Sequence, residues 1–377
     1  MSFLLIFRKI IRGLPYAVKE VRSQISDHTP FFCARPRVVY IWRSAPCNAR
    51  CIMCGFGFLK GDAFTAQFKS PLTDDMIPGL LDQIHELAGY GTMVSYGGGE
   101  PLLCHSLMDW LEQAKRLKLD FRFTSNGYTI DAGTAQRLVS AGLFNIGVSL
   151  ESLDPDINEI IRPYSGGTAK TIQAIELLLE EKRHQKSGIS INIKVTLTQL
   201  NMGCIVDIVR RWGLIEGVIV TPQMFEVDDS MPEGTKQRLW IKDIGRIETV
   251  VGELKKLKSE GYHINADDQA LDDCVTLYRN DPGRKSTIHN RTVTAEDRPP
   301  CTIGTDSLYI IDGAVRLCPF FPDIGSLLSG NQSLKKLWFS EKAREIRLAM
   351  RKCRTVCTLS CTRRVSLLAK VKLFLKM

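Results

Sequence analysis

The chain has 377 residues, of which 44% are hydrophobic and 24% are charged. This composition is ordinary for a globular protein and excludes a chain that is disordered along its length, and no apolar run approaches the roughly 20 residues of a membrane-spanning helix. The net charge of +9 is uneven, because residues 1–22 sum to +4, residues 342–377 to +10 and the stretch between them to −5. The body is therefore mildly acidic, and the two ends are strongly basic.

Repeating strand and helix patterns follow an amphipathic helix expected at residues 3–21 and a proline-rich hinge at residues 30–36. Runs of β-branched and aromatic residues predict six strands, at residues 38–42, 92–96, 121–124, 145–150, 189–197 and 217–220. Apolar residues at helical spacing predict helices between them, at residues 73–87, 107–117, 134–141, 169–181 and 205–212. This alternation predicts an α/β fold, a partial (β/α)6 TIM-type barrel whose site lies at the carboxyl ends of the strands.

The pattern changes in the last third of the chain. A charged helix at residues 238–261 and a polar stretch at residues 280–298 precede a hairpin whose turn is Asp312-Gly313, and a helix follows at residues 334–350. We therefore expect a small C-terminal α+β cysteine-rich extension. The predicted segments are an N-terminal helix with its hinge, a core, a linker, the extension and a basic tail, at residues 1–35, 36–235, 236–300, 301–361 and 362–377.

Twelve cysteines are the second unusual feature of the composition. A secreted disulfide scaffold is short and dense in cysteine, and this chain is neither. The apolar run at the N-terminus stops at Arg8 and Lys9 without a cleavage site, so it does not match a signal peptide. We expect a cytoplasmic protein, in which clustered cysteines more often bind metal than pair with each other.

Three cysteines follow the first predicted strand, in the order Cys47-x3-Cys51-x2-Cys54. A 4Fe–4S cluster ordinarily takes four thiolates, so three in one compact loop would leave one iron open to a further ligand. The alternative is a zinc site with a distant fourth ligand, because structural zinc prefers four closed ligands.

A glycine-rich turn, Gly98-Gly99-Glu100-Pro101, follows the second predicted strand. Glycines let the backbone approach a ligand closely, and Glu100 offers a carboxylate to an ammonium group. The alternative is a tight turn from strand to helix without a ligand. The cysteines and the turn together predict one site at this edge of the sheet.

These two motifs resemble those of the radical S-adenosylmethionine (radical SAM) superfamily, and the order of strands and helices matches it over about residues 37–225. The resemblance implies that Cys47, Cys51 and Cys54 hold a 4Fe–4S cluster whose open iron is chelated by S-adenosylmethionine (SAM). It further implies that the Gly98–Glu100 turn receives the methionine amino group of SAM.

Some individual residues outside these two motifs also resemble residues with known roles in the superfamily. Ser149 and Glu151 resemble its contacts to the ribose hydroxyls, and Arg162 resembles an arginine that meets the methionine carboxylate. Ser125 and Asn126 are weaker candidates at the same edge. One position departs from the pattern, because Met53 stands where an aromatic residue usually precedes the third cysteine; a thioether also packs on aromatic rings. The adenine contacts stay unassigned.

Five further cysteines lie near the C-terminus, at positions Cys301, Cys318, Cys353, Cys357 and Cys361. The spacing around the Asp312-Gly313 turn resembles the opening of the SPASM and Twitch extensions of radical SAM enzymes, which present ligands to auxiliary clusters. Full SPASM units need at least seven cysteines, so the resemblance implies one auxiliary 4Fe–4S cluster. Its ligands would be Cys301, Cys318 and two of the last three, and a structural zinc site is the alternative.

The resemblance implies an enzyme that reductively cleaves SAM to a 5′-deoxyadenosyl radical and abstracts hydrogen from a substrate. An electron donor of the flavodoxin or ferredoxin type would be its partner, and the net reaction would be oxidative modification of a peptide, a protein or a small molecule. The rival hypothesis is a non-catalytic iron–sulfur or zinc protein that carries electrons or acts as a sensor. No motif identifies the substrate or the group that donates or accepts a proton.

The basic ends leave two interpretations open. Residues 363–377 place apolar side chains mostly on one side of a basic helix, a pattern typical of peripheral contact with an anionic membrane, here the inner face. The alternative is that each end packs on the barrel with its lysines in solvent. Nucleic acid is disfavoured as a partner, because aromatic residues that could stack on bases are sparse near the C-terminus.

Overall fold

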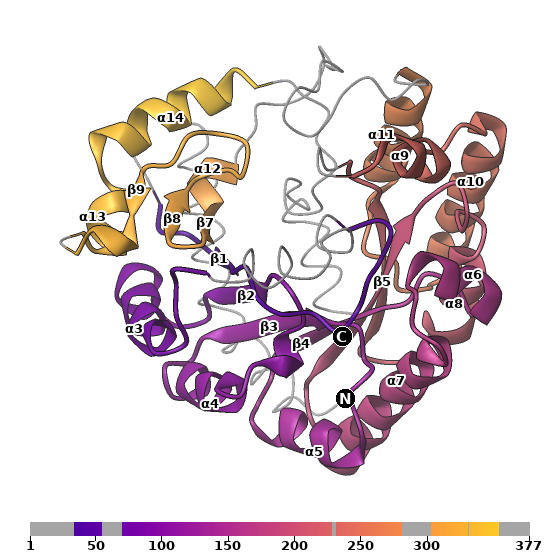
Figure 1. The fold of residues 1–377 in the computed structure, drawn as a ribbon, viewed down its shortest axis with the longest axis horizontal. Coiled ribbons are helices and arrows are strands. Elements are labelled where there is room, and N and C mark those ends of the chain that lie inside the picture. Colours follow the sequence, from indigo (N-terminus) through magenta and orange to yellow (C-terminus); the bar gives the residue numbers. More distant parts are fainter. Residues whose placement is uncertain (1–33, 55–69, 228–230, 281–302, 331, 354–377) are drawn as a thin grey trace, which may run out of the picture.

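The computed structural model describes residues 34–54, 70–227, 231–280, 303–330 and 332–353. A single nine-stranded sheet organises these residues, in the order β6-β5-β4-β3-β2-β1-β7-β8-β9 (Figure 1). The six predicted core strands are present and parallel, as β1 (Val38–Trp42), β2 (Met93–Gly97), β3 (Asp120–Ser125), β4 (Asn145–Ser149), β5 (Ser190–Leu197) and β6 (Val218–Met224). The prediction of a partial (β/α)6 barrel is confirmed.

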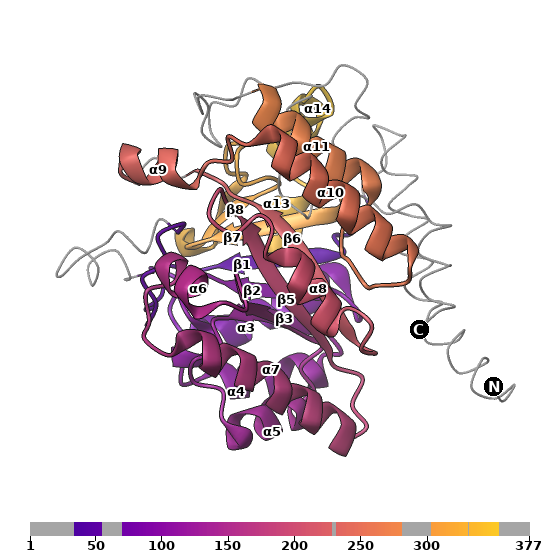
Figure 2. The ribbon, with the colours of Figure 1, turned by 90° about the vertical axis from the view of Figure 1, so that its right-hand side faces the viewer.

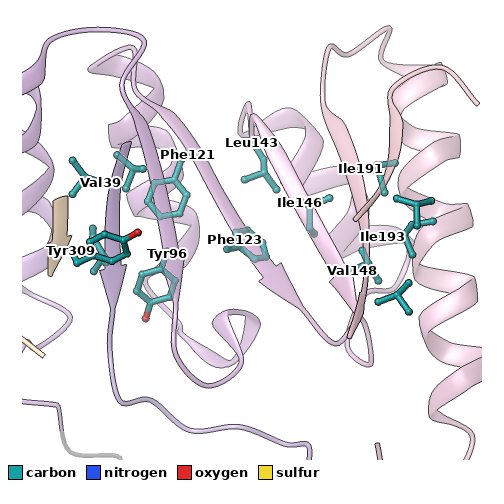
Figure 3. Close-up of a cluster of buried hydrophobic side chains, with 14 of the residues drawn as sticks. Val39, Tyr96, Phe121, Phe123, Leu143, Ile146, Val148, Ile191, Ile193 and Tyr309 are labelled. Carbon is teal, nitrogen blue, oxygen red and sulfur yellow. The ribbon is translucent and has the colours of Figure 1, made fainter. Parts of the chain in front are cut away.

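Helices cover the outer side of this curved sheet (Figure 1). The five expected helices are present, as α3 (Met76–Ala88), α4 (Leu107–Arg116), α5 (Ala132–Ser140), α7 (Gly167–His184) and α8 (Ile205–Trp212). Alternate residues of each strand point toward them, and Phe121, Phe123, Ile146 and Val148 are fully buried in the resulting core (Figure 3). Burial of this apolar surface is the main force that holds helices and sheet together.

The opposite side of the sheet, which we call the inner face, carries a different set of residues. Side chains alternate along a strand, so those between the core residues share this face. The set is mostly polar on β3, β4 and β5 and includes Arg122, Thr124, Ser149, Lys194 and Thr196. A polar inner face at the middle of the sheet is suited to holding a ligand rather than to packing.

Several helices differ from the expected ones. Helices that were not predicted include the short α6 (Pro155–Ile161) and α11 (Asp268–Asn280). The start of the helix expected at residues 238–261 is wrong. The chain instead forms α9 (Glu233–Leu239), and the helix ends before the buried Trp240. A second helix, α10 (Ile244–Ser259), begins where Asp243 accepts a hydrogen bond from the Arg246 amide. Helix α8 packs on β6, with α10 beside α8 and α11 packed on α10 (Figure 2).

The C-terminal elements continue the barrel sheet. Strand β7 (Ser307–Ile311) lies parallel to β1, and β8 (Ala314–Arg316) and β9 (Gly325–Ser326) follow in antiparallel pairing. The predicted hairpin is confirmed, with Asp312 and Gly313 both at positive φ, as a two-residue turn of this kind requires. Two short helical turns, α12 (Ile303–Asp306) and η3 (Leu327–Ser329), flank the hairpin. A third, η2 (Pro101–Leu103), belongs to the core and follows β2.

The helix expected at residues 334–350 is instead two helices, α13 (Leu334–Trp338) and α14 (Glu341–Arg351). The break occurs because the Ser340 hydroxyl accepts a hydrogen bond from the Ala343 amide and so starts a new helix. The predicted N-terminal helix, most of the polar stretch at 280–298 and the basic tail lie outside the described residues. Within the described ranges, no helix is long and apolar enough to cross a membrane.

Candidate functional site

The predicted cysteines lie together in the loop that follows β1. Cys47, Cys51 and Cys54 pack around the small side chain of Ala49 and against the ring of Tyr128, which follows β3. The loop is fixed at its middle, where the Ile52 amide donates to the Ile161 carbonyl at 2.9 Å. Burial raises the pKa of the Cys47 thiol to about 12, so without a metal this site favours the neutral thiol.

The glycine-rich turn packs directly against the backbone that leads into the cysteine loop. Gly98 and Gly99 both have positive φ, and a Cβ on Gly98 would lie 1.9 Å from the Arg43 carbonyl oxygen. A Cβ on Gly99 would lie 2.2 Å from the carbonyl oxygen of Ala45. Packing within the protein is therefore enough to require glycine at both positions, beyond any contact with a ligand.

Glu100 is buried at the end of this turn, and both of its carboxylate oxygens accept hydrogen bonds from backbone amides. The Leu102 amide donates to Oε1 at 3.2 Å, and the Asn126 amide donates to Oε2 at 2.8 Å. Burial raises the pKa of this carboxyl, and the bond from Asn126 opposes the rise. The side chain thus ties the end of β2 to the end of β3, and its predicted contact with a methionine amino group stays a prediction.

Ser125 and Asn126 lie at the same edge and hold the loops in place. The Ser125 hydroxyl accepts from the Gly127 amide at 2.9 Å. The Asn126 side-chain amide donates to the Asn48 side-chain carbonyl at 2.7 Å, directly beside Cys47. Sequence reasoning missed Asn48, because it stands at an unspecified position of the cysteine motif and its partner is 78 positions away.

A buried ion pair brings two further candidates to the cysteines. The Arg162 guanidinium donates to Glu151 at 2.8 Å and to the Cys51 sulfur at 3.3 Å. Glu151 also accepts from the Thr196 amide at 2.6 Å; burial raises the pKa of its carboxyl, and Arg162 opposes that rise. Ser149, the other predicted ribose contact, ends β4 on the inner face and is partly exposed.

Two tyrosines were not predicted. Tyr128 and Tyr164 stack with ring centroids 4.2 Å apart and close one side of the cysteine loop. The Tyr128 hydroxyl is buried and makes no hydrogen bond to the described residues, and burial raises its pKa to about 12. Met53, which replaces the expected aromatic residue, packs against this group and the main core.

The structure describes two of the five C-terminal cysteines. Cys318 is buried just after β8, and Cys353 follows α14. Cys301, Cys357 and Cys361 lie outside the described residues, so the auxiliary ligand set stays a prediction. No three His, Cys, Asp or Glu side chains of the described part are placed to hold a single metal ion.

Comparison with known proteins relates the part of the chain that carries the site to one family. Residues 44–210 match the family model described as the radical SAM superfamily. The chain is 24% identical to Fe-coproporphyrin III synthase from Methanosarcina barkeri over 52% of its length and 45% of that protein. It is 31% identical to a probable GTP 3′,8-cyclase from Thermococcus kodakarensis over 44% of its length and 49% of that protein. The chain thus spans about half the length of these relatives.

The fold is also found among solved structures. Streptococcus suis SuiB superposes with a TM-score of 0.60 at 15% identity, over 83% of this chain and 68% of SuiB. A likeness at this identity shows the shared fold alone. Residues 44–210, which include the cysteine loop and the glycine turn, are thus similar to the radical SAM superfamily, and the fold is similar to that of SuiB.

Proposed function

We propose that this protein is a radical SAM enzyme in which Cys47, Cys51 and Cys54 hold the SAM-binding 4Fe–4S cluster. The family uses this cluster and SAM as cofactors, and when bound they supply the reductive cleavage of SAM that yields a 5′-deoxyadenosyl radical. The observation that carries the assignment is the contact of Arg162 with Cys51, because it joins a cysteine of the loop to Glu151, a predicted SAM contact just after β4.

The residues present fit these cofactors. Three cysteines project from one short loop, and the orphaned Tyr128 hydroxyl and a buried guanidinium lie beside them. Arg162 would orient an anionic group of SAM next to the cysteines, since its other face is fixed by Glu151. Tyr128 and Tyr164 would exclude water from that side, and Asn48 and Asn126 would hold the loop rigid.

We further propose an auxiliary 4Fe–4S cluster bound by Cys301, Cys318 and two of Cys353, Cys357 and Cys361. Packing supports this set, because Gly304 lies against Met350, and these residues are each three positions from Cys301 and Cys353. Wild-type protein should then bind about eight irons per chain, and Cys318→Ala about four. Equal iron contents in the two proteins would contradict the auxiliary cluster.

The proposed substrate is a peptide, a protein or a small molecule that undergoes oxidation. SuiB has been solved bound to its precursor peptide SuiA, and that structure superposes on 93% of this chain with a TM-score of 0.57, a shared fold that favours a peptide. The two curated relatives named above, a coproporphyrin synthase and a probable GTP cyclase, favour a small molecule instead. An electron donor of the flavodoxin or ferredoxin type completes the proposal.

Anaerobically reconstituted protein tests the central assignment. Wild type should form 5′-deoxyadenosine from SAM in the presence of dithionite, and Cys51→Ala should form none. Cys204→Ala is the matched control, since Cys204 lies before α8 and away from the loop, and it should retain the wild-type rate. Equal product from wild type and Cys51→Ala would refute the assignment.

A further inference from the structure

Two cations lie on the inner face of the barrel, below the cysteine loop. Arg122 comes from the middle of β3, and Lys194 comes from β5, with β4 between these strands. Lys194 pairs in register with Ser149 at the end of β4, whereas Arg122 pairs with Asn145 at its start. None of the proposed cofactor contacts uses either cation.

A glycine makes room for the lysine side chain across β4. Gly147 pairs with Thr124 on one side and Asn192 on the other. A Cβ on Gly147 would lie 3.1 Å from Lys194 Cε and 2.6 Å from the Thr124 hydroxyl. The Lys194 side chain therefore leans back over Gly147, away from the strand end and toward the row that holds Arg122.

Neither cation has an acidic partner among the described residues. Arg122 donates to the Tyr40 hydroxyl at 3.4 Å and lies 5.7 Å from the centre of that ring. Asp120 shares this face at the start of β3 but forms no ion pair with either cation within the described ranges. The neighbouring polar side chains on β5 and β6 are neutral, with the Thr221 hydroxyl donating to Asn192.

Two like charges in a partly buried space are unfavourable unless an anion joins them. Burial first, and the charge of Arg122 second, lower the pKa of Lys194 to about 8. A guanidinium and an ammonium together form strong charge-assisted hydrogen bonds to a carboxylate or a phosphate. The inner face thus has the donors and the charge for one anionic group.

We propose that Arg122 and Lys194 bind an anionic group of the substrate, a carboxylate or a phosphate, an inference that rests on the proposed function. Arg122 is three residues before Ser125 at the strand end, which is roughly 10 Å along the strand. The substrate is therefore extended, with its anionic end deep on the inner face and its reacting end near the cysteine loop. The absence of a side chain at Gly147 leaves the room in which Lys194 reaches back toward that end.

Thermal unfolding of the full-length, anaerobically reconstituted protein tests this site with simple probes. Inorganic phosphate and acetate are each compared with chloride at pH 7 and equal ionic strength. In wild type, at least one of the two should raise the Tm by a few degrees over chloride, because a ligand that binds the folded state stabilises it. A shift with phosphate alone assigns a phosphate, and a shift with acetate alone assigns a carboxylate.

Lys194→Met should lose the anion-dependent shift, and Lys194→Arg should keep it. Lys256→Met, at an exposed position on α10, should also keep the full shift. Equal shifts in wild type and Lys194→Met, or no shift in wild type, would overturn the anion site. The same wild-type preparation is assayed for 5′-deoxyadenosine: product without an anion shift refutes this inference alone, and an anion shift without product refutes the proposed function alone.

Discussion

Asp312, in the turn of the C-terminal hairpin, accepts two hydrogen bonds from Ser44, three residues before the first cysteine of the cofactor loop. The Ser44 amide donates to Oδ1 and its hydroxyl donates to Oδ2, both at 2.7 Å. The Ser70 hydroxyl adds a third bond to Oδ1 at 2.5 Å. One carboxylate thus forms the hairpin turn and anchors the start of the cysteine loop.

Replacing Asp312 with asparagine should loosen this anchor. Asparagine keeps the preference for positive φ, so the turn survives while the charged acceptor is lost. We expect unfolding to become easier by about 1–3 kcal/mol, the range for hydrogen bonds to charged groups, and iron to be lost faster to a chelator. Asp323→Asn, which removes an exposed pair with Lys342, should change both measurements little. Identical chelation rates for wild type and Asp312→Asn would contradict the anchor.

The glycine turn predicts a sharp contrast between neighbouring positions. Gly98→Ala places a Cβ 1.9 Å from the Arg43 carbonyl oxygen at a φ of +94°, so we expect severe destabilisation or no folded protein. Gly97→Ala meets no atom within 4 Å and should fold. Circular dichroism melting of the apoproteins separates the two without any cofactor. If Gly98→Ala melts as Gly97→Ala does, the close approach of turn and loop is wrong.

The pair Arg162–Glu151 predicts a strong coupling. Arg162→Met leaves the Glu151 carboxylate buried without its partner, which costs about 3–5 kcal/mol. Adding Glu151→Gln removes the uncompensated charge, so the double variant should be more stable than Arg162→Met alone. A double-mutant cycle from urea unfolding measures the coupling, which we expect to exceed about 1 kcal/mol. Additive effects would mean that the two groups do not share a charge interaction.

Lys194 predicts a pH dependence of stability. Its pKa is lowered from 10.5 to about 8 in the folded protein, so between these values the unfolded chain binds a proton that the folded chain has released. The free energy of unfolding should therefore rise with pH across this window, by up to about 1.4 kcal/mol per pH unit. Urea unfolding at pH 7.5 and 9.5 should show wild type gaining stability relative to Lys194→Met. Parallel pH profiles for the two proteins would argue against a perturbed lysine.

The six core strands could be predicted because each is encoded by its own residues. In β5, for example, buried and accessible side chains alternate along all eight residues. The cysteine loop and the glycine turn could be found for the same reason, since each is a short continuous motif. Helix boundaries failed where one cap decided them, as Asp243 and Ser340 did.

Contacts between distant segments could not be predicted in this way. Nothing local in the sequence states that Asn126 holds Asn48, or that Tyr128 stacks on Tyr164. The pairing of β7 with β1 could not be predicted either, because the hairpin pattern does not indicate which edge of the sheet the hairpin joins. These contacts depend on the curvature of the whole sheet.

The place of β7 sets an order of events during synthesis. Strands β1 to β6 can pair as they emerge, but β1 keeps an open edge until residues 269 positions later join it, as the Arg37–Asp306 contact shows. Open strand edges invite pairing with other chains, so a nascent or truncated chain is exposed to aggregation. The strand made first is the last to gain both neighbours, and the cysteine loop is anchored only after Asp312 is made. The anchoring of the cysteine loop is therefore a late step in the folding of this chain.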